Sequence, residues 1–200
     1  MIVVIDYGMG NLHSVAKAIE KAGGTVRVSS DPAEVARAQK IVLPGVGAFA
    51  DAKTELVRLK LGQPVVDHIR AGKKFLGICL GLQLLFDTSY EDGTHGGLGL
   101  IKGDVVRFKA PGLKVPHIGW NTLKMTPNVG LFEGVSDGAS VYFVHSYYVA
   151  PRDSSVVAAT TEYGETFTSA IATPNVWATQ FHPEKSQRVG LRMLENFVRW

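Results

Sequence analysis

The chain has 200 residues, of which 46% are hydrophobic and 20% charged, proportions typical of a globular protein with a substantial core. Twenty-one basic and 18 acidic residues leave a net charge of +3. This excess is too small and too dispersed to indicate a nucleic-acid partner. We therefore expect a single domain over residues 1–200 that binds no nucleic acid.

The sequence indicates neither a membrane anchor nor an oxidising compartment. No segment approaches the roughly 18 apolar residues that a bilayer span needs. The apolar run at residues 1–6 is short for a signal peptide, and no basic region precedes it. The single cysteine cannot form an internal disulfide, which suits a reducing compartment. We expect a cytoplasmic protein that does not contact a membrane.

In the first half of the chain, strand patterns alternate with helix patterns. Short apolar runs ended by turn residues predict strands; these cover residues 2–6, 25–29, 40–43 and 74–78. Apolar residues at helical spacing predict helices between them, one after Asn11, one opened by Pro32, and others near residues 48–60, 64–71 and 79–86. Strands joined by helices imply a parallel sheet that is covered on both faces.

The second half consists mainly of short strand patterns with short links, which favour antiparallel pairing. The predicted strands are residues 98–101, 104–108, 120–125, 140–145, 156–160, 167–173 and 176–181, and a helix follows over residues 187–200. The expected fold class is α/β, an open mixed, mostly parallel sheet flanked by helices, with antiparallel strands in the second half. Sites in such sheets lie in loops at the carboxyl ends of strands, here residues 7–11, 44–47 and 79–81.

Cys79 stands where a strand is expected to turn into a helix, between small residues in Gly77-Ile78-Cys79-Leu80-Gly81. This layout is typical of a nucleophile elbow, in which a sharp turn strains the central residue. A thiol there would sit at a helix start, where free N–H groups and the dipole favour a thiolate. The N–H of Leu80 would face an oxyanion. The pentapeptide alone leaves open that Cys79 is a core residue.

A base for this thiol is offered by His182, which stands with Glu184 at the end of a predicted strand. Residues two apart in extended chain point the same way, so Glu184 can orient the imidazole as in a catalytic triad. A surface turn is the alternative for His-Pro-Glu alone. The loop Pro44-Gly45-Val46-Gly47 can offer an amide to an oxyanion hole, or be a plain turn. Cysteine and histidine motifs together favour an enzyme.

These segments resemble the triad-type (class I) glutamine amidotransferases. The resemblance is carried by Gly-Ile-Cys-Leu-Gly-Leu-Gln at residues 77–83 and His-Pro-Glu at 182–184. Longer matches, which are similar to the glutaminase subunits of imidazole glycerol phosphate synthases, lie at residues 6–12, 43–49, 116–121, 142–147 and 181–186. The similarity extends from residue 2 to about residue 197. Leu-Pro-Gly-Val-Gly in place of Gly-Gly-Pro-Gly supports the narrower family.

The resemblance implies that Cys79, His182 and Glu184 hydrolyse glutamine to glutamate and ammonia, without a cofactor or metal. Amides of Val46 and Leu80 would form the oxyanion hole, once the loop carrying Val46 reorients in response to the partner's ligand. The positions that match glutamine-binding residues of the family are Gly47, Gln83, Glu91, Ser146 and Tyr147. Without the family, Gln83 would be placed on a helix surface and Glu91 in a solvated loop.

The resemblance also implies a partner. Family members form a heterodimer with a (β/α)8-barrel cyclase, which receives the ammonia shielded from bulk water. With it the cyclase makes imidazole glycerol phosphate and AICAR in histidine biosynthesis. The matching interface positions are Asn11, Trp120, Tyr142 and Lys185. Core packing is the alternative for Trp120.

Other functions explain less of the sequence. A nicotinamide oxidoreductase is disfavoured because Gly8-Met9-Gly10 begins a dinucleotide fingerprint but His13 stands where glycine is needed. An inactive binding module does not account for the His182–Glu184 pair. A thiol hydrolase of another substrate, or a glutaminase that serves another ammonia-using synthase, remains open. No His-Glu-x-x-His motif or paired cysteines predict a metal.

Overall fold

The computed structural model describes residues 1–109 and 112–200. Its helices are α1 (Leu12–Lys21), α2 (Pro32–Arg37), α3 (Phe49–Arg58), α4 (Gly62–Arg70), α5 (Leu80–Gln83) and α6 (Gln187–Arg199), and its 3₁₀ turns are η1 (Gly130–Phe132), η2 (Ser154–Val156) and η3 (Pro183–Lys185). Its strands are β1 (Ile2–Ile5), β2 (Val26–Ser29), β3 (Lys40–Gly45), β4 (Lys74–Cys79), β5 (Phe86–Ser89), β6 (His95–Gly96), β7 (Ile101–Arg107), β8 (His117–Thr122), β9 (Lys124–Met125), β10 (Ser140–His145), β11 (Tyr147–Pro151), β12 (Val157–Glu162), β13 (Thr166–Ala172) and β14 (Val176–Thr179).

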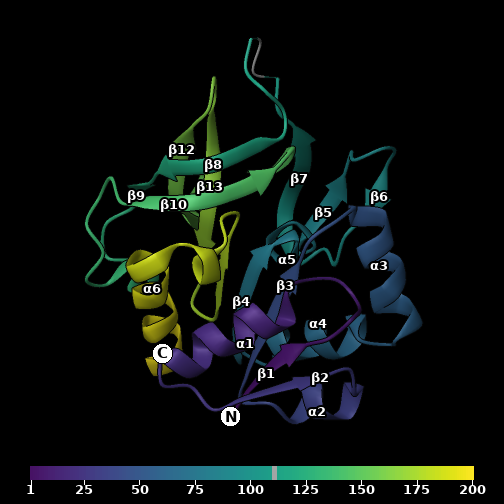
Figure 1. Cartoon of the computed structure of the whole chain (residues 1–200). Coiled ribbons are helices and arrows are strands. Elements are labelled where there is room, and N and C mark those ends of the chain that lie inside the picture. The colour runs from purple at the N-terminus through teal and green to yellow at the C-terminus, as the bar shows by residue number, and fades with distance from the viewer. Residues whose placement is uncertain (110–111) are drawn as a thin grey trace.

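Most of the described strands join one mixed sheet, with the order β2-β1-β3-β4-β14-β13-β11-β7-β5-β6 (Figure 1). From β2 to β14 the neighbouring strands are parallel. Gly45 at the end of β3 pairs with Cys79 at the end of β4, and Thr179 of β14 pairs with Ile78. The carboxyl ends of these three strands therefore meet at one edge, although β14 lies almost 100 residues after β4.

Helices cover both faces of the parallel part of the sheet. Alternate residues of a strand face opposite sides, and β1 shows this with Ile2 and Val4 in one apolar cluster and Val3 and Ile5 in the other. The first cluster contains residues of α1 and α6, and the second contains residues of α2, α3 and α4. Because all four β1 side chains are buried, the sequence of this strand is a continuous apolar run.

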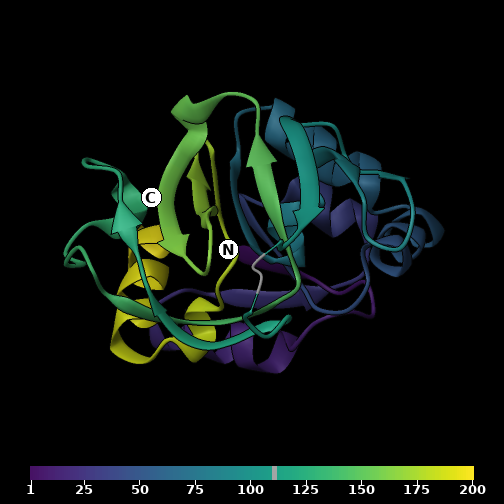
Figure 2. The ribbon, with the colours of Figure 1, turned by 90° about the horizontal axis from the view of Figure 1, so that it is seen from above.

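A separate two-stranded ribbon, β8 with β10, lies across the antiparallel part of the molecule (Figures 1 and 2). The two strands pair antiparallel, with Tyr142 opposite Trp120. Inward residues such as Val141 and Phe143 are buried, whereas Ile118 and Trp120 are exposed. The ribbon thus has one face on the core and one face toward solvent. None of the helices in residues 1–109 and 112–200 is long and apolar enough to cross a membrane.

The predicted fold class is confirmed, but several predicted elements differ from the structure, and β6 was not predicted. The helix expected over residues 79–86 is the single turn α5, and residues 86–89 form β5 instead. Buried apolar runs such as Leu84-Leu85-Phe86 fit either element, so periodicity cannot distinguish them. The two strands expected at residues 98–101 and 104–108 are one strand, β7, which begins only at Ile101. The strand expected at residues 120–125 is divided between β8 and β9.

A further strand that the sequence did not predict is β11. The apolar and aromatic run continues past His145, but the chain leaves the ribbon at Ser146 and pairs Tyr147–Pro151 with β7 in the large sheet. The change of sheet depends on tertiary pairing and leaves no break in the hydrophobic pattern. Ser146 thereby lies between two strands that belong to different sheets.

Candidate active site

Cys79 occupies a strained turn between β4 and α5. Its φ of 54° and ψ of −106° lie outside the regions that residues with a side chain normally adopt. Gly81 allows the turn, because a Cβ there would overlap the carbonyl oxygen of Leu43 in β3. Since α5 has only four residues, its dipole is weaker than the longer predicted helix would provide. The strain positions the sulfur at the sheet edge.

His182 and Glu184 form a buried pair immediately after β14. Nδ1 of His182 lies 2.8 Å from Oε1 of Glu184, and the two side chains are 3% and 2% exposed. The backbone N–H of His182 donates to the carbonyl of Tyr142 at 2.9 Å. Ser186 adds a second tie, since its hydroxyl donates to the His182 carbonyl and accepts from the N–H of Tyr142. Strand β10 therefore holds the segment that carries the imidazole.

The environment of His182 favours its protonated form. Burial lowers the pKa of the imidazole, but the Cys79 sulfur and the Glu184 carboxylate oppose this, and together they raise the pKa to about 10. The other ring nitrogen, Nε2, makes no hydrogen bond of ordinary geometry with any described residue. The Cys79 sulfur is therefore close enough to affect the imidazole, but the two groups are not aligned for a hydrogen bond. Catalytic contacts of this kind often tighten only when substrate binds.

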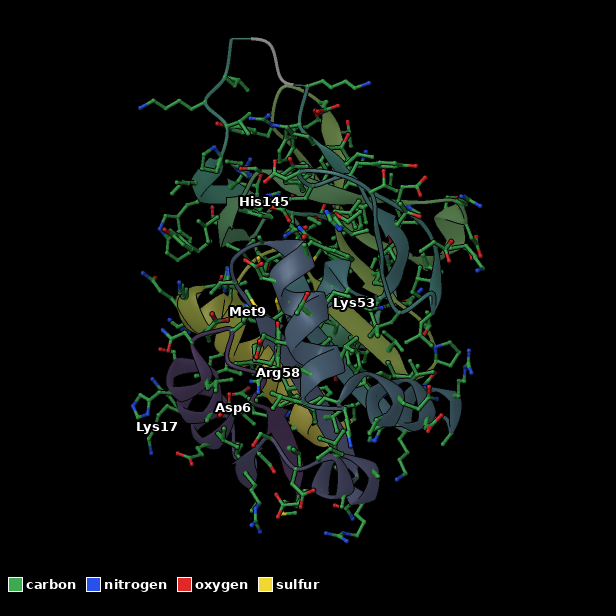
Figure 3. The ribbon with its side chains drawn as sticks, turned by 90° about the vertical axis from the view of Figure 1, so that its right-hand side faces the viewer. Asp6, Met9, Lys17, Lys53, Arg58 and His145 are labelled. Atoms are coloured by element: carbon green, nitrogen blue, oxygen red, sulfur yellow. The ribbon has the colours of Figure 1, made fainter. Side chains whose placement is uncertain are left out.

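A cavity of about 300 Å³ opens beside Cys79. Its walls come from the ends of β3, β4 and β10 and from the loop after β5: Val46, Gly47, Cys79, Leu80, Gln83, Glu91, Val144, His145, Ser146, Tyr147 and Lys185. Both expected oxyanion residues and all five expected glutamine-binding residues are among them. His145, one of these wall residues, lies in the upper half of the view in Figure 3, and Met9, in the loop after β1, lies below it. The cavity size suits a small ligand.

Larger hollows lie elsewhere on the surface. One of about 600 Å³ follows residues 125–137, and one of about 550 Å³ lies between that segment and α6. Neither is lined by Cys79, so we place the site at the smaller cavity, whose wall contains the strained cysteine. Within residues 1–109 and 112–200, no group of three or more His, Cys, Asp or Glu side chains is arranged to hold a metal ion.

Glu91 does more than line the cavity. Its Oε2 accepts the backbone N–H of Phe49 at 2.8 Å, at the start of α3, where Ala48 offers no side-chain cap. The pKa of Glu91 is raised, mainly by desolvation, while the Phe49 N–H partly offsets this effect. Glu91 is thus a loop residue as the alternative has it, but it is partly buried and bonded rather than freely solvated. The hydrogen bond holds the carboxylate at the cavity wall.

Gln83 is buried at 5% exposure, so the interpretation as a helix-surface residue is wrong. Its Nε2 donates to the Tyr147 carbonyl at 3.1 Å and to Oε1 of Gln180 at 3.2 Å. Nε2 of Gln180 in turn lies 3.6 Å from the Cys79 sulfur. Gln180 was not singled out from the sequence, although it stands only two residues before His182, in the bend that follows β14.

The last residue of β3, Gly45, lies close to the hydroxyl of Tyr7. Gly45 must be glycine, because a Cβ there would overlap the Tyr7 hydroxyl. That hydroxyl is fully buried and has no hydrogen-bond partner in the described chain. Desolvation, with a contribution from Cys79, raises the pKa of Tyr7. Val46 follows as an exposed residue of the cavity wall.

Three of the four expected interface residues lie together. The rings of Trp120 and Tyr142 meet edge to face at 6.0 Å, and Nζ of Lys185 lies 5.8 Å from the centre of the Tyr142 ring. Trp120 is 48% exposed, so core packing does not explain it. Asn11 has another local contact, since its Oδ1 accepts the N–H of Ser14 and caps α1.

The family model for class-I glutamine amidotransferases matches residues 3–200. The chain belongs to this family. The amidotransferase is 58% identical to the imidazole glycerol phosphate synthase subunit HisH of Syntrophotalea carbinolica, over 98% of both chains. It is 56% identical to the HisH subunit of Aquifex aeolicus, over 98% of this chain and 95% of that one. The resemblance expected from the motifs is thereby confirmed.

Solved structures support the fold of the amidotransferase. PurLQS from Thermotoga maritima matches with a TM-score of 0.78 at 17% identity, over 99% of this chain and 97% of that one. A GMP synthase protein from Thermoplasma acidophilum matches with a TM-score of 0.74 at 22% identity, over 99% and 92% of the two chains. At these identities the likeness shows the fold alone.

Proposed function

We propose that this amidotransferase is the glutaminase subunit of an imidazole glycerol phosphate synthase, with residues 1–200 as a single domain. The observation that carries the proposal is a strained cysteine in the wall of a small cavity, with a buried His182–Glu184 pair close to its sulfur. The high identity to named subunits of that synthase over nearly the whole chain supports this choice over a glutaminase of another synthase.

The chemistry follows from the positions of the three side chains. The Cys79 sulfur attacks the side-chain amide carbon of glutamine, and His182 donates its proton to the leaving nitrogen, so that ammonia departs and a thioester remains. His182 then takes a proton from water, whose oxygen attacks the thioester and releases glutamate and the thiolate. Glu184 orients the ring and stabilises its cationic form. Backbone amides of Val46 and Leu80 stabilise the oxyanion of each tetrahedral intermediate.

Substrate recognition uses the other walls of the cavity. Glu91 presents a carboxylate that can pair with the α-ammonium of glutamine, since the hydrogen bond from Phe49 holds it in place. Gly47 and the backbone at Ser146 and Tyr147 complete the contacts, with Gln83 tying the Tyr147 carbonyl to α5. A thiol hydrolase with an uncharged substrate would not need a carboxylate at this wall.

The partner is a (β/α)8-barrel cyclase, which docks on the surface formed by Trp120, Tyr142 and Lys185, with Asn11 at the edge. Lys185 both lines the cavity and lies over the Tyr142 ring, so this surface adjoins the site of ammonia release. Direct transfer would keep ammonia from protonation in bulk water, and the partner's ligand would act on the loop carrying Val46. A catalytic thiol suits the reducing cytoplasm.

Alkylation tests the proposal. The glutamine analogue 6-diazo-5-oxo-norleucine should add once, to Cys79, as weighed by mass spectrometry. Lack of an adduct in the presence of the cyclase and its ligand would contradict a glutaminase. The variant Cys79→Ala should lose glutamine hydrolysis but retain synthesis from added ammonium salts with the cyclase. If both activities disappear, Cys79 is structural and the mechanism is wrong.

A further inference from the structure

We propose that Gln180 is a positioning residue for Cys79, whose side-chain amide holds the sulfur in its attacking position and favours the thiolate. The proposal rests on the thiol chemistry assigned to Cys79 above. Gln180 is fully buried, and its backbone N–H donates to the Ser169 carbonyl of β13 at 2.9 Å. It is therefore fixed beside the nucleophile without lining the cavity.

The hydrogen bonds around Gln180 determine which end of its amide faces the sulfur. Nε2 of Gln83 donates to the Tyr147 carbonyl, and a carbonyl can only accept, so the identity of that nitrogen is settled. The same nitrogen of Gln83 uses its second proton to donate to the side chain of Gln180 at 3.2 Å. Gln180 must therefore present its oxygen, Oε1, to Gln83. The amide nitrogen of Gln180 consequently points toward Cys79, 3.6 Å from the sulfur.

The direction of this contact matters for the chemistry. An N–H group that points at sulfur stabilises the anion more than the neutral thiol, because hydrogen bonds to charged groups are the stronger ones. It also limits rotation of the Cys79 side chain toward the core. Gln180 and His182 lie two residues apart in the bend that follows β14, so the segment after one strand supplies both a neutral donor and the base.

Several titratable groups face Cys79 and must be distinguished from Gln180. His182 approaches from the segment after β14 and Tyr7 from the loop after β1, and both are coupled to the sulfur by charge. Glu91, His145 and Lys185 line the same cavity. Gln180 carries no charge at any pH, so its removal shifts the pH dependence of thiol reactivity without adding or deleting a titrating group.

The experiment measures the rate of Cys79 alkylation by iodoacetamide across pH in the full chain, because this reagent needs no glutamine recognition. Gln180→Met keeps the length of the side chain and removes the donor, and Gln180→Glu keeps the shape and places a carboxylate beside the sulfur. Ser169→Ala is the matched control, since its buried hydroxyl, in the adjoining strand, has no hydrogen-bond partner in the described chain. Thermal unfolding verifies that each variant is folded.

At neutral pH we expect alkylation to slow about 10-fold in Gln180→Met and further in Gln180→Glu, as expected from loss of a hydrogen bond to a charged group. Both rates should approach that of the parent protein at alkaline pH. In the complex with the cyclase, kcat for glutamine should fall while KM stays within about twofold, because Gln180 does not contact the cavity.

Equal alkylation profiles for the parent, Gln180→Met and Gln180→Glu would overturn the proposal and leave Gln180 a packing residue. If Gln180→Met does not fold, Gln180→Ala takes its place, because it also removes the donor without adding a charge. Failure of the proposed function is recognised separately. In that case 6-diazo-5-oxo-norleucine does not label the parent protein, whereas the iodoacetamide profiles still report on the contact between Gln180 and Cys79.

Discussion

Nδ1 of His182 and Oε1 of Glu184 are 2.8 Å apart, and both side chains are almost entirely withdrawn from water. In the proposed mechanism this carboxylate orients the ring and leaves Nε2 as the nitrogen that exchanges protons with Cys79. The other carboxylate oxygen, Oε2, is buried without a hydrogen-bond partner in the described chain. The interaction within the pair therefore depends on the negative charge of the Glu184 carboxylate and the positive charge of the His182 imidazolium.

Replacing Glu184 by Gln should reduce kcat for glutamine hydrolysis by about 100- to 10,000-fold, with little change in KM, because the neutral amide no longer stabilises the imidazolium. Steady-state kinetics in the presence of the cyclase and its ligand measure this effect. Glu195→Gln is a suitable control, since Glu195 is partly exposed on α6 and its ion pair with Arg192 is long, with 3.4 Å between the charged atoms. Equal kinetics for the two variants would remove Glu184 from the mechanism.

The raised pKa of His182 predicts how stability depends on pH. The folded protein holds a proton that the unfolded chain releases above the ordinary value of 6.5. The stabilising contribution is therefore complete below pH 6.5 and is lost as pH rises toward the folded-state pKa of about 10. Urea unfolding at stepped pH should show the free-energy difference between the parent and His182→Gln declining over this window. A difference that grows with pH would contradict it.

Gly81→Ala should destabilise the protein by about 3 kcal/mol or more, since its Cβ would overlap backbone atoms of β3 that cannot move aside cheaply. Gly62→Ala provides the control, because the nearest atom to its Cβ would be a Leu98 methyl at 3.9 Å. Alanine at that helical position should be neutral or mildly stabilising. Denaturant midpoints compare the two. Similar midpoints would mean that the α5–β3 approach is not as close as described.

Glu91 serves both a helix end and the cavity, and two substitutions separate these roles. Glu91→Gln keeps an acceptor for the Phe49 N–H and should raise KM for glutamine with almost unchanged stability. Glu91→Ala should raise KM similarly and also lower the free energy of unfolding by about 1 kcal/mol, as loss of a helix cap does. An unchanged KM in both variants would exclude Glu91 from recognition of the α-ammonium.

Trp120→Ala should weaken binding of the cyclase by about 2 kcal/mol, roughly 30-fold, as expected for an exposed aromatic anchor. The stability of the isolated chain should change little, because the side chain is 48% exposed. Calorimetric titration of the cyclase measures the affinity. Val57→Ala is the matched control, since Val57 is 63% exposed on α3. If both variants bind as the parent does, the partner docks on another surface.

The Tyr7 hydroxyl is buried without a partner in the described chain, so Tyr7→Phe removes a polar atom that forms no internal hydrogen bond. The free energy of unfolding should stay within about 1 kcal/mol of the parent or rise, because an unsatisfied buried group is destabilising. Chemical denaturation measures this change. A loss of several kcal/mol would show that the hydroxyl has a bonding partner.

Local pattern was sufficient for much of this protein. Apolar runs and turn residues predicted β1 to β4 and the helices between them, and the glycines around Cys79 predicted a sharp turn, because these features depend on neighbours within a few residues. The spacing of His182 and Glu184 predicted that the two could be close, but it assumed an extended chain, whereas Glu184 lies in the 3₁₀ turn η3 that follows His182. The motifs together were specific enough to indicate the family.

Tertiary structure decided what depends on distant contacts. The conversion of residues 86–89 to a strand, the exit of the chain from the ribbon at Ser146, and the capping of α3 by Glu91 all require partners far along the sequence. The contact of Gln180 with Cys79 joins residues 101 positions apart, because β14 inserts beside β4 in the sheet. Hydrophobic periodicity records whether a side chain is buried, but it does not identify the group against which that side chain packs.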